Sequence, residues 1–96
     1  MDICEAIRNR KLVSFYYKNH QRVLVPGAYG LHKTTGNKLL RAYQIRGGRN
    51  TGETPGWGLF KIEEISSYQV LDEQIENVPP GYVQGDSALS PIYCQL

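Results

Sequence analysis

Residues 46–49 read Arg-Gly-Gly-Arg, a combination of residue types that can bind an anion. Glycines allow backbone N–H groups to turn toward an anion, and arginines add paired donors for a phosphate. Such segments are also typical of RNA binding. The competing interpretation is a long hairpin that needs glycines to turn and charges at its tip. Trp57 follows as a stacking platform, an interface anchor or a plug at one end of a barrel.

A second group of basic and aromatic residues lies on runs that read as strands. Residues two apart share a face of a strand, so Arg41 and Tyr43 project together, while Leu40 and Ala42 point inward. An arginine beside a tyrosine can pair with one phosphate and stack on one base. The sequence therefore predicts a nucleic-acid or nucleotide interface made by Arg22, Arg41, Tyr43, Arg46 and Arg49. A solvated face, or a surface for another protein chain, remains the alternative.

The sequence lacks the residue groupings that catalysis or metal binding would need. His20 and His32 lie in or beside expected turns, with no carboxylate at ligand spacing. Glu63 and Glu64 are adjacent, so on a strand they would face opposite ways and could not act on one bond. No serine has the context of a nucleophile elbow. We therefore expect a non-catalytic protein without a metal site or cofactor.

The charges are distributed unevenly along the 96 residues, although the net charge is only +2. Residues 1–50 contain ten lysines and arginines and two acids, whereas residues 51–96 contain one lysine and seven acids. This asymmetry can indicate an anion-binding face. Alternatively, the two halves interleave in the fold and neutralise each other.

Cys4 and Cys94 lie near opposite ends of the chain and match neither zinc-site spacing nor a disulfide framework. We expect two thiols without a chemical role. The first residues lack a basic start followed by an apolar run, and no run approaches the roughly 20 apolar residues of a membrane span. The cytoplasm is the expected location.

The local patterns predict a short helix followed by strands. Asp2 and Glu5 have capping-box spacing, and Ile3, Ala6 and Ile7 form one apolar face. A polar turn at 18–21 separates the first two strands, and Pro26 should bend the second or place it at an edge. The five expected strands cover residues 12–17, 22–32, 38–45, 57–65 and 67–72. This pattern predicts a mainly β protein, with a small antiparallel sheet curled into a barrel.

The strings AIRNRKLVSFYY, RVLVPGAYG, KLLRAY and LFKIEEISSYQVLD resemble the WYL domain over about residues 3–75. Of the tripeptide that names the family, only the leucine is present, at Leu40. Phe60, Glu63 and Ile65 match a later signature, in which Gly58, Leu59 and Glu64 stand where the family has arginines. The fuller string, with PGYVQGD and IY, is similar to a compact stand-alone subgroup of bacterial and phage proteins.

The resemblance implies a five-stranded Sm-like or SH3-like barrel with an N-terminal helix. It implies a WYL-like domain over residues 1–75. Residues 76–96 are broken by prolines and glycines but are too apolar for a free tail, so we expect a C-terminal extension that packs on the barrel and ends in a short helix or strand. The implied function is a regulatory binding module that contacts nucleic acid or an anionic nucleotide. The alternative is a protein-interaction or self-association module, acting as an accessory protein or an inhibitor.

Overall fold

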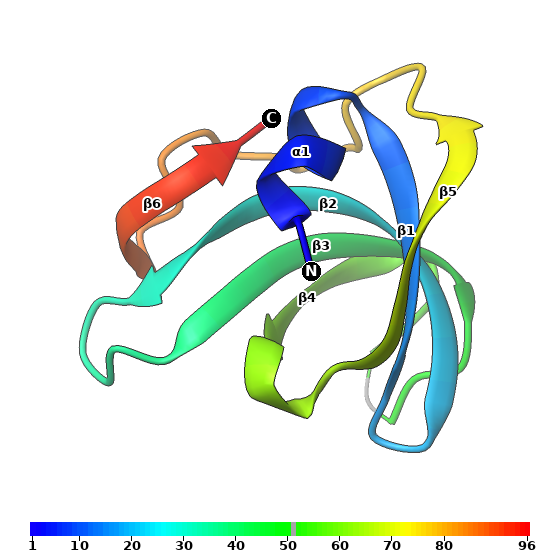
Figure 1. Ribbon diagram of the computed structural model, residues 1–96, viewed down its shortest axis with the longest axis horizontal. Helices are drawn as coiled ribbons and strands as arrows, with labels where there is room; N and C mark the ends of the chain where they lie inside the picture. Colours follow the sequence, from blue (N-terminus) through cyan, green and yellow to red (C-terminus); the bar gives the residue numbers. More distant parts are fainter. Residues whose placement is uncertain (51) are drawn as a thin grey trace.

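A computed structural model describes residues 1–50 and 52–96 of the chain (Figure 1). It contains one α-helix, six strands and a short 3-10 helix. In chain order these are α1 (Ile3–Arg8), β1 (Lys11–Tyr17), β2 (His20–His32), β3 (Lys38–Gly47), β4 (Gly56–Lys61), η1 (Ile62–Glu64), β5 (Ser66–Gln74) and β6 (Leu89–Gln95). The prediction of a mainly β protein with a short N-terminal helix is confirmed.

The helix α1 begins as the sequence predicts. The Asp2 side chain accepts a hydrogen bond of 2.9 Å from the Glu5 backbone N–H, and Ile3, Ala6 and Ile7 are buried. Six residues are too few for a stable helix in water, so α1 depends on the surface that it covers. It packs against β1, β2 and β6.

The strand β2 organises the sheet. The strand order is β4-β3-β2-β1-β5, with antiparallel pairing throughout, and β6 pairs with β2 outside this order. The first half of β2 pairs with β1, and its second half pairs with β6 beyond a register shift between Pro26 and Ala28. Pro26 thus lies at the bend that sequence analysis expected, because proline cannot donate to a ladder.

The sheet differs from the expected barrel in two respects. It has six strands instead of five, and within the described residues β4 and β5, at the two ends of the strand order, do not pair with each other. The expected fourth strand is also too long: it ends at Lys61, and residues 62–64 form η1. This turn carries the chain from β4 toward β5 and leaves Glu63 and Glu64 exposed.

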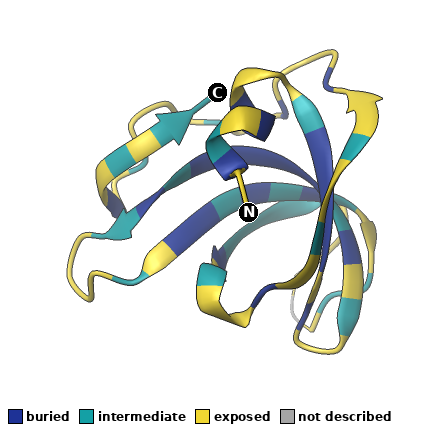
Figure 2. Ribbon diagram, in the orientation of Figure 1, coloured by how far each residue is buried: buried dark blue, intermediate teal, exposed yellow. Residues whose placement is uncertain are grey.

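The main core lies inside the curved sheet (Figure 2). Leu40 and Ala42 are 0% exposed, which confirms their predicted inward direction. Their neighbours Arg41 and Tyr43 are partly buried and lie on the opposite face of β3. The core combines α1 with the concave side of the sheet; its buried members are Ile3, Ala6, Ile7, Val13, Phe15, Tyr17, Leu24, Leu40, Ala42, Phe60 and Ile65.

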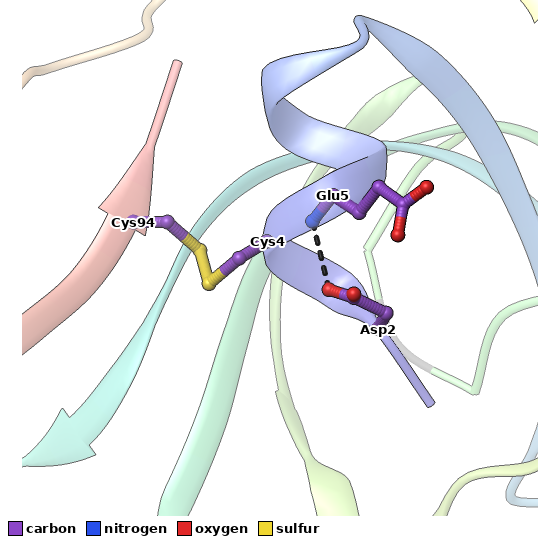
Figure 3. Close-up of a disulfide and its surroundings, with 4 residues drawn as sticks. All are labelled: Asp2, Cys4, Glu5 and Cys94. Atoms are coloured by element: carbon purple, nitrogen blue, oxygen red, sulfur yellow. Dashed lines mark hydrogen bonds between the residues drawn. A yellow bond between two sulfur atoms is a disulfide. The ribbon is translucent and has the colours of Figure 1, made fainter.

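The expectation of two thiols is wrong, because Cys4 and Cys94 form a disulfide (Figure 3). The bond joins α1 to β6, and their Cα atoms are 5.6 Å apart although 90 positions separate the two cysteines in the sequence. The spacing of two cysteines along a chain does not report their distance in a fold. Here α1 and β6 both contact β2, which brings the two thiols together.

The C-terminal segment adds β6 to the second half of β2. Its last residue is held twice, because the Leu96 N–H donates to the Gly27 carbonyl and the Tyr82 hydroxyl donates to the Leu96 carbonyl. Among the described residues, no helix has the length and apolar character needed to cross a membrane.

Candidate anion-binding pocket

The five residues expected at a binding surface do not form one cluster. Arg22 and Arg49 line the same pocket, whereas Arg41 lines a different one. Tyr43 packs edge-on against Trp57, with ring centroids 5.2 Å apart. Arg46 is exposed and forms a 2.7 Å ion pair with Glu73.

The pocket that contains Arg22 and Arg49 has a volume of about 310 Å³. It lies between the β1–β2 turn, the segment after β3 and the strand β4. The residues around it are Tyr17, Lys18, Arg22, Arg49, Asn50, Gly58, Leu59 and Phe60. Three of these are cationic and none is acidic.

Arg22 is buried, with only 5% of its surface exposed. Its Nε and Nη2 donate to the Tyr17 carbonyl at 3.2 and 2.9 Å, and its Nη1 donates to Gln44 Oε1 at 3.3 Å. The guanidinium carbon lies 5.4 Å from the ring centre of Tyr17 and 5.6 Å from that of Phe60. These contacts hold the cation by hydrogen bonds and cation–π attraction.

Gln44 holds the Arg22 side chain in place by accepting its hydrogen bond. Its side chain is 0% exposed, and its Nε2 donates to the backbone carbonyls of Arg46 and Gly48. Gly47 lies opposite Arg22 in the register of β2 and β3. A side chain at Gly47 would collide with the Gln21 backbone, and its φ of +97° also favours glycine. Glycine is therefore needed at position 47 because β2 and β3 approach closely there.

Arg49 completes the pocket from the segment after β3. Its Nη1 donates to the Glu53 carbonyl at 3.0 Å, and its Nη2 donates to the Trp57 carbonyl at 3.1 Å. Its Nε is buried and has no hydrogen-bond partner among the described residues. Both bonds go to neutral carbonyl groups, so they leave the positive charge of Arg49 uncompensated.

The two arginines raise the electrostatic potential of the pocket. Burial lowers the pKa of the Arg22 guanidinium, and the nearby charge of Arg49 lowers it further. Within residues 1–50 and 52–96, the ion pairs lie elsewhere: Arg41 with Asp86, Arg46 with Glu73 and Lys61 with Glu64. A bound anion would offset the repulsion between the two cations and the cost of burying Arg22.

A hydrogen-bond chain joins the two segments at the rim. Asn50 Nδ2 donates 3.1 Å to the Lys18 carbonyl, and Asn50 Oδ1 lies 2.8 Å from His20 Nε2. The Tyr17 hydroxyl accepts from the Lys61 backbone N–H. These hydrogen bonds fix the residues that line the pocket. The rim is anchored to the turn at Lys18 and Asn19, which both have positive φ.

Sequence analysis named Arg22 and Arg49 but missed Gln44, Tyr17, Phe60 and the rim. A signal for Gln44 was available, because positions 40, 42 and 44 all point inward on β3. A polar residue at the third inward position needs a buried partner. The proximity of Arg49 had no such signal, because it depends on how a long irregular segment folds back.

No group of three metal-ligating side chains occurs in the described part of the chain. Comparison with known proteins yielded no relative: no family model matches the sequence, and no curated protein or solved structure matches the chain.

Proposed function

We propose that this chain is a non-catalytic binding module that holds the anionic group of a nucleotide or nucleic acid in the pocket of Arg22 and Arg49. One observation carries the proposal: two guanidinium groups share a pocket that no acidic residue lines. A buried cation without a counterion is costly, and a bound anion would offset that cost.

A phosphate matches the N–H donors of Arg22 and Arg49 that are not used by the hydrogen bonds described above. A guanidinium has five N–H groups, and Arg22 uses three of them for Tyr17 and Gln44, leaving two. Arg49 uses two and keeps its buried Nε–H free of any described partner. Phosphate oxygens accept several such charge-assisted bonds at once. Lys18 adds a third cation at the mouth.

The lining favours binding over catalysis. The hydroxyl of Tyr17 already accepts a backbone hydrogen bond from Lys61, and Asn50 is engaged with Lys18 and His20. Neither a carboxylate nor a thiol lines the pocket, so it lacks the paired base and nucleophile of hydrolytic sites.

We place the chain in the WYL type of regulatory module, of bacterial or phage origin, with a sheet related to Sm-like and SH3-like barrels. A short helix followed by a strongly curved antiparallel sheet supports this placement. The proposed location is the cytoplasm. Disulfides are uncommon there because glutathione and thioredoxin keep thiols reduced, so the Cys4–Cys94 bond is the observation that argues against this location. Rapid alkylation of freshly lysed cells tests the location, and a disulfide already formed there contradicts it.

The proposal is tested by titrating the protein with GMP and with ten-nucleotide single strands of DNA and RNA, using calorimetry. Arg49→Met should weaken binding by about ten-fold or more, because charge-assisted bonds contribute roughly 1.5–3 kcal/mol each. Binding by the unchanged protein should also weaken as sodium chloride rises from about 50 to about 200 mM, through counterion release.

The matched control is Arg46→Met, which removes the same charge from an exposed side chain paired with Glu73. It should leave GMP affinity within about two-fold of the unchanged protein, since Arg46 does not line the pocket and its exposed charge is already paired with Glu73 and screened by salt. Equal losses of GMP affinity in Arg49→Met and Arg46→Met would mean that binding depends on net charge and not on this pocket. Absence of binding at low salt, together with a dimer in size-exclusion chromatography, would instead favour self-association through the edges of β4 and β5.

A further inference from the structure

A second pocket, of about 370 Å³, lies between the outer face of the sheet and the C-terminal segment. One side comes from β2, β3 and β4, and the other side comes from residues 81–87, which follow the stretch of residues 3–75 that resembles the WYL domain. The lining residues are Ala28, Arg41, Trp57, Gly81, Tyr82, Val83, Gly85, Asp86 and Ser87.

Aromatic rings form one wall of this pocket. The rings of Trp57 and Tyr82 are tilted by 32°, with centroids 6.0 Å apart, and Tyr43 packs edge-on behind Trp57. Trp57 Nε1 donates to the Pro80 carbonyl at 2.7 Å, and the Tyr82 hydroxyl donates to Leu96. Because the polar end of each ring is already bonded, the rings are held in place as an apolar platform.

An arginine held by an aspartate also lines this pocket. Arg41 Nε donates to Asp86 Oδ2 at 2.6 Å and its Nη2 to Oδ1 at 3.4 Å. The Asp86 side chain is 11% exposed and also accepts from the Ala88 N–H, so it is fixed. The Arg41 side chain is 31% exposed, and its Nη1 donates to no group in the described chain.

The charge of this pocket differs from that of the Arg22–Arg49 pocket. Asp86 neutralises Arg41, so the second pocket has no net charge to attract a phosphate. It offers two aromatic rings and, beside them, the N–H donors of Arg41 that Asp86 leaves unused. A neutral planar ring with adjacent acceptors on one edge matches both features, and guanine presents O6 and N7 in that way.

We infer that the second pocket binds a guanine base, which stacks on Trp57 and Tyr82 while Arg41, oriented by Asp86, donates to O6 and N7. This inference deepens the proposed function and rests on it, because it names a base of the nucleotide or nucleic-acid ligand. The two pockets lie on opposite faces of β3, since Arg41 points away from Leu40 and Ala42 whereas Gln44, which holds Arg22, shares their face; the phosphate held by Arg22 and Arg49 would therefore belong to a different nucleotide or ligand molecule. Adenine fits less well, since its N6 amino group is a donor where Arg41 needs an acceptor.

Neutral nucleosides test this site without involving the phosphate pocket. Trp57 is the one tryptophan of the chain and its side chain lines this pocket, so its fluorescence reports binding there. Guanosine and inosine, which both carry O6 and N7, should quench it with similar affinity. Adenosine and 7-deazaguanosine should bind about ten-fold more weakly, the effect of losing a bidentate base contact.

Two variants complete the design. Arg41→Met should abolish the preference for guanosine over adenosine, whereas Arg49→Met should preserve it. Equal quenching by guanosine and adenosine, or no quenching by either, overturns the inference even if Arg41→Met fails to fold. Guanosine selectivity without any GMP effect of Arg49→Met would overturn the proposed phosphate pocket alone. A weaker affinity of Arg49→Met for GMP without any guanosine selectivity would overturn the guanine site alone.

Discussion

At the residue scale, Arg22 is the least expected feature of the molecule. A guanidinium buried on a strand normally needs a carboxylate, and Arg22 has two carbonyl oxygens and two aromatic rings instead. Gln44 supplies one of those oxygens and is itself tied to the backbone of Arg46 and Gly48. The charge is therefore held in a fixed position but is not neutralised, which suits an arginine that meets an anionic ligand.

Tyr68 gives a prediction of its own. Its hydroxyl is buried and has no hydrogen-bond partner among the described residues, and burial, with a smaller effect of Asp2, raises its pKa to about 12. Because the folded state keeps this proton longer than the unfolded chain, the unfolding free energy is unaffected by Tyr68 ionisation below the ordinary pKa of 10.0 and falls as pH rises toward about 12. Tyr68→Phe should thus reduce the loss of unfolding free energy at alkaline pH.

At neutral pH the same variant should leave the unfolding free energy unchanged or raise it by up to about 1 kcal/mol, because no native hydrogen bond is lost. Urea unfolding at pH 8 and at about pH 11 measures both effects. These two pH values lie below and above the pKa of an ordinary tyrosine. Tyr16→Phe is the control, because Tyr16 is exposed. A clear destabilisation of Tyr68→Phe at pH 8 would mean that the hydroxyl has a partner.

At the element scale, β2 and the disulfide hold the chain together. The bend at Pro26 lets one strand pair with β1 in its first half and with β6 in its second. The short helix α1 and the late strand β6 both pack on this strand, and Cys4 and Cys94 join them covalently. The ends of the chain thus depend on each other for their place on the sheet (Figure 1).

Reduction of the disulfide should lower the unfolding free energy by about 2–5 kcal/mol, because the bond closes nearly the whole chain into one loop. Urea unfolding with and without dithiothreitol measures the change. The double variant Cys4→Ala/Cys94→Ala should be equally stable in both conditions. If reductant leaves the unchanged protein as stable as before, the bond does not constrain the folded chain.

At the scale of the whole molecule, two ion pairs connect the basic first half of the sequence to the acidic second half in the described chain. Arg41 pairs with Asp86 and Arg46 pairs with Glu73, in each case joining the basic first half to the acidic second half. Arg22 and Arg49 are left without acidic partners in the described chain. Interleaving of the two halves therefore accounts for two ion pairs, and the proposed anion site would use two of the cations that these pairs leave over.

Local patterns predicted much of this arrangement. The alternation at Leu40 and Ala42 identified the inner face of β3, and Asp2 identified the start of α1. The closeness of Arg22 and Arg49 could not be predicted, because it depends on pairing between distant strands. The same holds for the bond from Cys4 to Cys94. Arg41 was expected to be free, but the irregular segment that carries Asp86 has no periodicity to place it.

The central claim is that Arg22 and Arg49 together form the anion site, and side-chain NMR of isotope-labelled protein tests it directly. Inorganic phosphate is the probe, because it carries no base. The Nε–Hε signals of Arg22 and Arg49 should shift together and saturate with one affinity, while that of Arg46 stays in place. Shifts of equal size at Arg46 and the exposed Arg8, or no saturable shift at Arg22 and Arg49, would contradict the claim.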